Sequence, residues 1–416
     1  MMYSLDKNNP ENIFKASFFS QNREKLLSKL PEGAVVVLAA HSLMQRSRDT
    51  AYPFRQESNF WYLTGIQEPG CVLFLSRKES FVVAPQRSIT HEIFDGAISP
   101  SELQAISGLD EIYPSRSGWR HLRELCQQAS AVYTRLPAKQ YYQPAGLQLN
   151  GAAHRLVGRL KRIKQLPSLQ DVTPTLQELR LIKQPSELVA LRNAIAVTSQ
   201  ALEQITIDLT SYNNEREIAA ELSYIYQQNG MTHGYEPIVA SGKNACTLHY
   251  VENNQLIASN QLLLIDSGAE FFGYSADITR TFAVGELSQR QKHVHQGVAD
   301  LQQQAFALFR PGVSLRDIER AFMDIMAVTL RELSLITGNQ QKDIRCYYPH
   351  ALSHYLGLDV HDVGSYDTPL EPGMVLTVEP GIYIPEEAMG VRIEDNILIT
   401  ESSYQNLTKD CQQPRY

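Results

Sequence analysis

The stretch that decides the fold reads LLLIDSGAEFFGYSADITRTFAVG, residues 262–285. Two apolar runs flank a turn sequence around Phe272 and Gly273, which predicts a β-hairpin. Asp266 ends the first predicted strand and Asp277 begins the second, so strand pairing would bring the two carboxylates together. Close carboxylates repel, and a shared proton or a bound cation relieves the repulsion. Two aspartates that only cap turns are the alternative interpretation.

The same stretch contains Asp-Ser-Gly, the sequence of an aspartic-protease loop. That chemistry needs two such loops facing each other, from one chain or from a homodimer. The chain has no second copy, because Asp49 is followed by Thr-Ala and Asp367 by Thr-Pro. An aspartic protease is therefore disfavoured.

Three histidines fall within PHALSHYLGLDVHDVG, residues 349–364. His350 and His354 have the spacing of two zinc ligands on one helix face, but the zincin motif requires Glu directly after the first histidine, and this chain has Ala351. A metalloprotease of that type is disfavoured. A single histidine is more often structural than a ligand, whereas three so close together, ending at His361, favour a site.

Two further predicted strands, MVLTVEPGIYI and MGVRIEDNILIT, each place a glutamate among apolar residues, at Glu379 and Glu394. An ionised carboxylate in such surroundings is costly unless it is paired or coordinates a cation. Arg392 could pair with one of them in a structural ion pair. Two glutamates joined by a short connection favour a second carboxylate pair.

Together, four carboxylates and one histidine are too many carboxylates for a typical mononuclear zinc site. They suit two divalent cations bridged by carboxylates, and the hard oxygen donors favour manganese or cobalt. Two such metals can hold a bridging hydroxide and polarise a carbonyl group. The sequence therefore predicts hydrolysis.

The chain has 416 residues, which favours two or three domains. Strand-like and helix-like runs alternate from Gly33 to about Leu169, which is typical of an α/β domain. The stretch PSLQDVTP, residues 167–174, brackets polar residues with two prolines. We expect domains at 1–172 and 173–416.

The composition of the chain disfavours several classes of binding partner. The formal net charge of −7 disfavours nucleic acid. No run approaches the ~18 apolar residues of a membrane span, and we expect neither a secretory signal nor a membrane partner. Five scattered cysteines without a CxxC pair are typical of reduced thiols, so we expect a cytoplasmic protein.

These motifs resemble one family, the pita-bread (creatinase/methionine aminopeptidase) metallopeptidases, and within it aminopeptidase P, the Xaa-Pro aminopeptidases. The family's ordered ligands Asp, Asp, His, Glu, Glu fall on Asp266, Asp277, His354, Glu379 and Glu394. The stretch DTAYPFRQESNFWYLTGIQEPG, residues 49–70, resembles the N-terminal domain of aminopeptidase P and prolidase, which methionine aminopeptidases lack.

The resemblance implies an α/β N-terminal creatinase-like domain and an α+β pita-bread catalytic domain. It implies two divalent metal ions per subunit, with manganese expected and cobalt or zinc as alternatives. Glu379 would also shuttle the proton, and His249 and His361 would stabilise the tetrahedral intermediate. The expected substrate-binding residues are His249, His350, His361, Tyr383 and Arg392.

The N-terminal domain implies a homodimer or homotetramer in which one subunit reaches towards the active site of another. Phe94 stands where relatives commonly have tryptophan, and Ala351 where many have glycine. The connection between Glu379 and Glu394 is compact compared with some bacterial relatives.

The implied function is a Xaa-Pro aminopeptidase acting on peptides with proline in second position. Prolidase, which cuts Xaa-Pro dipeptides, is the alternative. A non-catalytic pita-bread binding module is disfavoured, because all five ligand positions are filled.

Overall fold

The computed structural model describes residues 13–136, 149–411, 414 and 416. The chain forms two compact units, of which the first ends at Arg180 and the second begins at Leu181. The domain boundary expected at residue 172 stays a prediction. The helix that follows it, α7 (Thr173–Leu181), ends where the two units meet in the sequence.

The first unit is an α/β domain, as the alternating pattern predicts. Its elements are α1 (Ala16–Ser28), β1 (Val35–Ala39), β2 (Gln45–Ser47), β3 (Thr50–Ala51), α2 (Ser58–Thr64), β4 (Val72–Leu75), β5 (Ser80–Ala84), α3 (Ile89–Asp95), α4 (Pro100–Ser107), β6 (Glu111–Pro114), α5 (Ser115–Gln128), β7 (Val132–Thr134), α6 (Ala152–Leu160), β8 (Leu169–Asp171) and α7. Its main sheet has the order β6-β5-β4-β1-β7-β8, with β4 antiparallel to both neighbours.

Helix α5 packs closely on this sheet, because Gly118 leaves no side chain between them. A Cβ atom at Gly118 would lie 2.9 Å from a methyl group of Val83. Leu122 and Cys126 of the same helix join the buried core beneath the sheet. Helix α3 differs, since Ile89, Ile93 and Phe94 are all strongly exposed.

The second unit carries every metal-ligand candidate. Its elements are α8 (Pro185–Ile207), η2 (Leu209–Ser211), α9 (Glu215–Gln228), β9 (Thr232–His233), β10 (Ile238–Ser241), η3 (Gly242–Cys246), β11 (Gln261–Ser267), β12 (Ala269–Phe271), β13 (Tyr274–Ser275), β14 (Ile278–Val284), α10 (Gln289–Phe306), α11 (Leu315–Glu332), α12 (Gln341–Tyr347), β15 (Val375–Val378), β16 (Gly381–Ile384), η4 (Pro385–Glu387), β17 (Met389–Arg392), β18 (Asp395–Ile399) and β19 (Tyr404–Asn406).

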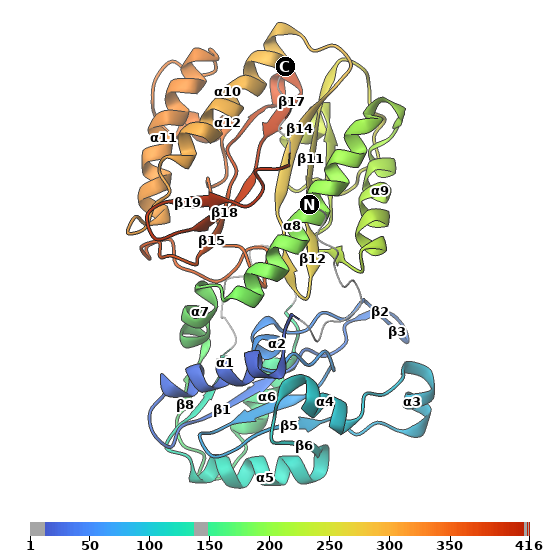
Figure 1. Cartoon of the computed structure of the whole chain (residues 1–416), viewed down its shortest axis with the longest axis vertical. Coiled ribbons are helices and arrows are strands. Elements are labelled where there is room, and N and C mark those ends of the chain that lie inside the picture. Colours follow the sequence, from blue (N-terminus) through green and yellow to red (C-terminus); the bar gives the residue numbers. More distant parts are fainter. Residues whose placement is uncertain (1–12, 137–148, 412–413, 415) are drawn as a thin grey trace. The chain divides into compact units, whose positions relative to one another are not determined.

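Helices cover the strands of this unit from two sides (Figure 1). Helices α8 and α9 bury an apolar core against β11 and β14. Helices α10, α11 and α12 bury a second core against β15 to β18. This α+β arrangement places the strands that carry the carboxylates in the middle of the unit. No helix in the part of the chain that the structure describes is long and apolar enough to cross a membrane.

The predicted hairpin is present and has a more elaborate tip. Strands β11 and β14 pair antiparallel, with Asp266 opposite Thr279. The residues between them form a separate ribbon, β12 with β13, whose turn residues Phe272 and Gly273 have φ angles of 51° and 83°. Asp277 directly precedes β14, so both aspartates lie at the same end of the long strand pair.

The two predicted glutamate strands are each divided in two. Strand β15 pairs with β18, whereas β16 pairs with β17. Glu379 follows β15 and Glu394 precedes β18, so both glutamates lie where the strands change partners. The hairpin β16–β17 closes through η4.

Helix starts follow local sequence signals. Helix α8 begins at Pro185 with a capping box formed by Gln184 and Glu187. Helix α9 begins after Asn214, whose side chain accepts a hydrogen bond from the backbone N–H of Arg216.

Gly268 is expected to be essential for the strand ends that carry both aspartates. A Cβ atom there would lie 1.8 Å from the carbonyl oxygen of Ala276, whose N–H is held by Ala269. Since this neighbour is backbone and cannot swing away, Gly268→Ala should lower the free energy of unfolding by about 3 kcal/mol.

Thermal unfolding measured in excess chelator would check this expectation. Gly338→Ala is the matched control, because no heavy atom of the described residues lies within 4 Å of its Cβ position, apart from Gly338 itself and its two chain neighbours. An unchanged melting temperature for Gly268→Ala would contradict the close approach.

Candidate metal centre

The ends of β11 and β14 hold two carboxylates around one phenol. The hydroxyl of Tyr235 lies 2.5 Å from Oδ1 of Asp266 and 2.6 Å from Oδ1 of Asp277. Burial and both carboxylates raise the pKa of Tyr235 well above its usual value. The phenol has one proton to donate, so it bridges the two carboxylates without neutralising both.

The second oxygen of Asp266 is held by an arginine. Arg392 donates from Nη2 to Asp266 Oδ2 over 2.6 Å, from Nη1 to the Tyr383 hydroxyl over 2.9 Å and from Nε to Thr279 Oγ1 over 3.1 Å. Burial raises the pKa of Asp266, and Arg392 opposes that effect only in part. Arg392 therefore pairs with an aspartate, whereas the sequence suggested a glutamate.

His354 is oriented by the backbone around it. Its backbone N–H donates to Thr377 Oγ1, and its ring nitrogen Nδ1 lies 3.0 Å from the carbonyl oxygen of Tyr355. Because a carbonyl oxygen only accepts, Nδ1 carries a proton, and Nε2 faces Asp277 Oδ2 at 3.3 Å and Glu379 Oε1 at 3.5 Å. A neutral imidazole would aim its Nε2 lone pair at these carboxylates, an arrangement that a cation relieves.

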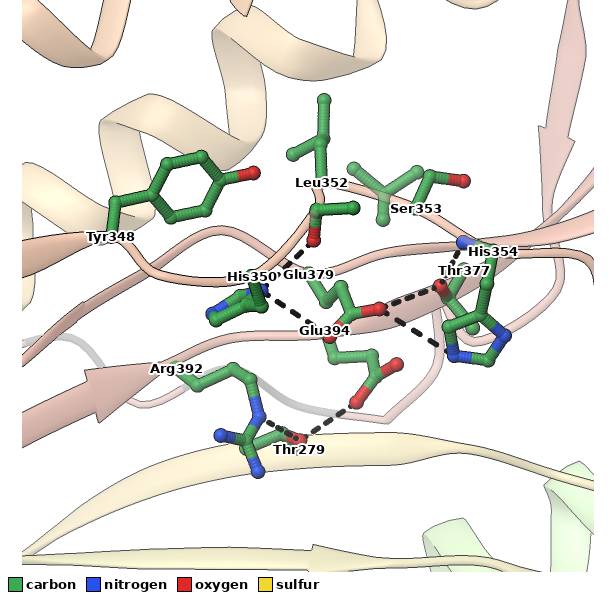
Figure 2. Close-up of polar contacts among 12 residues, drawn as sticks. Thr279, Tyr348, His350, Leu352, Ser353, His354, Thr377, Glu379, Arg392 and Glu394 are labelled. Carbon is green, nitrogen blue, oxygen red and sulfur yellow. Dashed lines mark hydrogen bonds and ion pairs between the residues drawn. The ribbon is translucent and has the colours of Figure 1, made fainter. Parts of the chain in front are cut away.

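The glutamates are fixed through their backbone on opposite sides. The N–H of Glu379 donates to the carbonyl of Leu352, and the N–H of Glu394 donates to the carbonyl of Thr279. Glu394 Oε2 accepts from the Thr279 hydroxyl over 2.7 Å. Its buried Oε1 has no hydrogen-bond partner among the residues that the structure describes. Figure 2 shows both glutamates between His350, His354 and Arg392.

All five residues predicted as ligands thus come together. Ligand atoms of Asp277, His354 and Glu394 all lie within 4.8 Å of one another, Asp266 joins them through the Tyr235 hydroxyl, and Glu379 joins them at His354. We call Asp266, Asp277, Glu379 and Glu394 the carboxylate cluster.

Charge in this site is unbalanced. Burial raises the pKa of Glu394 well above its usual value and that of Glu379 to about 7. Burial lowers the pKa of His354, but Asp277 and Glu379 outweigh burial and raise it to about 9. Four carboxylates around one arginine and one histidine, with one carboxylate oxygen unbonded, fit divalent cations well.

Two further histidines that were predicted for the site, His350 and His361, lie beside this cluster. His350 Nε2 lies 2.8 Å from the Tyr383 hydroxyl, and the ring of His361 packs edge-on to His354 with centroids 4.5 Å apart. Burial and the charge of His354 lower the pKa of His361, Asp277 raises it, and His249 lowers it further. His249 and His361 are exposed, whereas His350 is partly buried.

Tyr383 and Arg392 are both buried and hydrogen-bonded within the site. Their predicted contact with substrate stays a prediction. Asp362, which follows His361, forms an ion pair with Lys183 at 2.9 Å, and both side chains are only 1% exposed. Gly357 leaves the room for this pair, since a Cβ there would lie 2.1 Å from Asp362 Oδ2.

Several site residues escaped sequence analysis, namely Tyr235, Thr279, Thr377 and Lys183. Thr279 and Thr377 have the β-branched side chains of ordinary strand residues, and Tyr235 is a single tyrosine in a loop. Only the alternation of strand side chains could have indicated Thr279, which lies two positions after Asp277 and therefore on the same face.

Two protein-family models match this chain. The family model of metallopeptidase family M24 matches residues 189–401, and the model of the aminopeptidase P N-terminal domain matches residues 19–133. The chain is 35% identical to the Xaa-Pro aminopeptidase of Escherichia coli K12, with 94% of each chain covered. It is 32% identical to human Xaa-Pro aminopeptidase 3, with 94% of this chain and 83% of the human protein covered.

Solved structures of aminopeptidase P are also similar to this chain. Zinc-substituted aminopeptidase P of Escherichia coli in complex with product superposes with a TM-score of 0.86 at 32% identity, covering 96% of both chains. Proline aminopeptidase P II of Yersinia pestis gives a TM-score of 0.84 at 33% identity, covering 96% of this chain and 97% of the other.

Replacing one carboxylate of the carboxylate cluster by an amide should have opposite effects on stability in the absence and in the presence of metal. Without a divalent cation, the raised pKa of Glu394 in the folded protein costs stability at neutral pH, and the neutral side chain of Glu394→Gln keeps the shape without that cost, so the variant should melt at a higher temperature than the wild type. With manganese, the wild type should gain more stability, because the variant lacks one anionic ligand.

Calorimetry in chelator and in excess manganese would measure both effects. The exposed Glu332→Gln on α11 is the matched control and should change neither melting temperature by much. Equal stabilisation of Glu394→Gln and wild type by manganese would argue against Glu394 as a ligand.

Proposed function

The chain belongs to the aminopeptidase P family of M24 metallopeptidases, and from this membership we propose that it removes the N-terminal residue from peptides with proline in second position. As a family member it is a peptidase that uses divalent metal ions. The structural observation that supports metal-dependent hydrolysis is the carboxylate cluster around His354, in which the buried Glu394 Oε1 has no hydrogen-bond partner among the described residues.

The five clustered residues would hold two divalent cations, for which we propose manganese, with cobalt or zinc as alternatives. Carboxylate oxygens outnumber the single imidazole nitrogen, and such hard donors favour manganese over zinc. When bound, the cations supply an activated water and polarise the scissile carbonyl group.

The proton steps fall to Glu379. Its Oε1 faces His354 and its Oε2 lies 3.8 Å from His350 Nδ1, so its carboxylate lies between the predicted ligands and the predicted substrate pocket. Glu379 would take a proton from the attacking water and pass it to the proline nitrogen that leaves. The proton thereby travels along one side chain.

Histidines at the rim would bind the reacting group. His249 and His361 are exposed, so their imidazoles are accessible to a peptide and can donate to the developing oxyanion. His350 would line the pocket for the proline side. Tyr383, which Arg392 holds in turn, orients His350, so we propose that these two residues position His350 as well as bind substrate.

We further propose that the first unit mediates a homodimer or homotetramer. Ile89, Ile93 and Phe94 of α3 are between 75% and 81% exposed, and an apolar cluster of this kind is typical of a contact surface. We also propose a cytoplasmic location, which the five free cysteines support.

The substrate proposal can be tested with a Xaa-Pro-Pro tripeptide and the matching Xaa-Pro dipeptide. The manganese-loaded protein should release the N-terminal residue from the tripeptide. Amino-acid analysis would measure the free amino acid. Cleavage of the dipeptide alone would instead identify a prolidase. No release with manganese, cobalt or zinc would overturn the proposal.

Asp277→Asn should lower this activity by more than about 100-fold. Losing a residue that only supports a metal ligand costs up to about 100-fold, and the loss of a ligand itself should exceed that. Asp300→Asn, an exposed change on α10, is the control and should retain wild-type turnover. Full activity of Asp277→Asn would exclude Asp277 from the metal site.

A further inference from the structure

A fully buried carboxylate lies outside the metal centre. Glu215 is the first residue of α9, and its side chain is 0% exposed. Among the described residues no lysine, arginine or histidine forms an ion pair with it. An ionised group in that position needs compensation from hydrogen bonds.

Five donors supply that compensation. Glu215 Oε1 accepts from the Ser241 N–H at 2.8 Å, the Ser241 hydroxyl at 2.6 Å and Asn244 Nδ2 at 3.1 Å. Glu215 Oε2 accepts from the Tyr250 hydroxyl at 2.7 Å and the Gln255 N–H at 3.0 Å. The N-terminus of α9 adds a favourable helix dipole. Each carboxylate oxygen thus faces one backbone N–H, which can only donate.

All five donors belong to one segment, residues 241–255, which we call the His249 loop. This loop begins with the 3-10 turn η3 and contains no α-helix or β-strand after Ser241. Glu215 therefore joins the start, the middle and the end of the loop at a single point. A second tie comes from buried Asn253, which bonds the backbone of Val239 and Pro237.

Tyr250 is the residue next to His249 and is fixed at both its hydroxyl and its ring. Its hydroxyl bonds Glu215, and its ring packs with Ala245 and Leu264 in a small apolar cluster. His249, the adjacent residue, is exposed. We therefore expect the position of His249 to depend on the backbone that Tyr250 and Glu215 fix.

We propose that Glu215 is a positioning residue that holds His249 at the rim of the metal centre by gathering the His249 loop around one buried carboxylate. The inference rests on the proposed function where it concerns turnover, and on the geometry alone where it concerns the loop. Substrate turnover and loop order should therefore respond together when Glu215 changes.

Glu215→Gln is the sharpest test, because it keeps the shape and removes only the ability to accept on both sides. Either orientation of the amide directs an NH₂ group at a backbone N–H, of Ser241 or of Gln255. We expect kcat/KM for the tripeptide to fall by about 10-fold to 100-fold, with the metal content unchanged. Hydrogen exchange of residues 242–255 should become faster.

Glu217→Gln is the matched control, since Glu217 lies in the same helical turn but is exposed and, among the described residues, accepts a hydrogen bond only from the backbone N–H of Asn213. It should leave turnover and loop exchange as in the wild type. If Glu215→Gln fails to fold, Tyr250→Phe removes one of the five donors and keeps the ring, and it should show a smaller effect of the same kind.

A double-mutant cycle with His249→Ala separates positioning from general damage. If Glu215 acts through His249, Glu215→Gln should cost little further activity in the His249→Ala background. An equal loss in both backgrounds, a loss of metal, or unchanged exchange of the loop would overturn the proposal. A wild type that releases no amino acid would refute the proposed function instead, and the exchange experiment would still decide whether Glu215 orders the loop.

Discussion

Four carboxylates gathered inside one unit are the constraint on which the rest of the structure depends. Two unit charges about 4 Å apart repel by ~4 kcal/mol at an effective dielectric constant near 20, so such a cluster needs compensation. The chain provides part of it through Arg392, His354 and the Tyr235 phenol. Divalent cations held by the proposed ligands would contribute the remainder. The stability of such a fold would be linked to metal binding by mass action, so the same residues would serve both function and stability.

Much of this could be predicted from sequence, because the decisive signals are local. Strand alternation and turn residues indicate the β11–β14 hairpin, and the cost of burying charge singles out Glu379 and Glu394 among apolar neighbours. The order of the five ligand candidates then supplies the family, and the comparisons confirm it. Helix starts at Pro185 and Asn214 are equally local, since a cap bonds the turn beside it.

What the sequence did not reveal depends on contacts between distant parts of the chain. Tyr235 reaches an aspartate 42 positions away, and Arg392 reaches one 126 positions away. No spacing rule connects such residues. Glu215 is a further case, because a glutamate in the first turn of a helix looks like an ordinary capping residue. Only the packed structure shows that it is buried and that its donors come from one loop.

The exchange of strand partners at Glu379 and Glu394 has a consequence for how such sites can diversify. The hairpin β16–β17 is closed at its base by the pairing of Gly381 with Arg392, and its turn lies at the opposite end, at η4. A longer or shorter turn would leave the base and therefore the spacing of the glutamates unchanged. Insertions or deletions can therefore change the length of this turn while the predicted metal ligands Glu379 and Glu394 keep their positions.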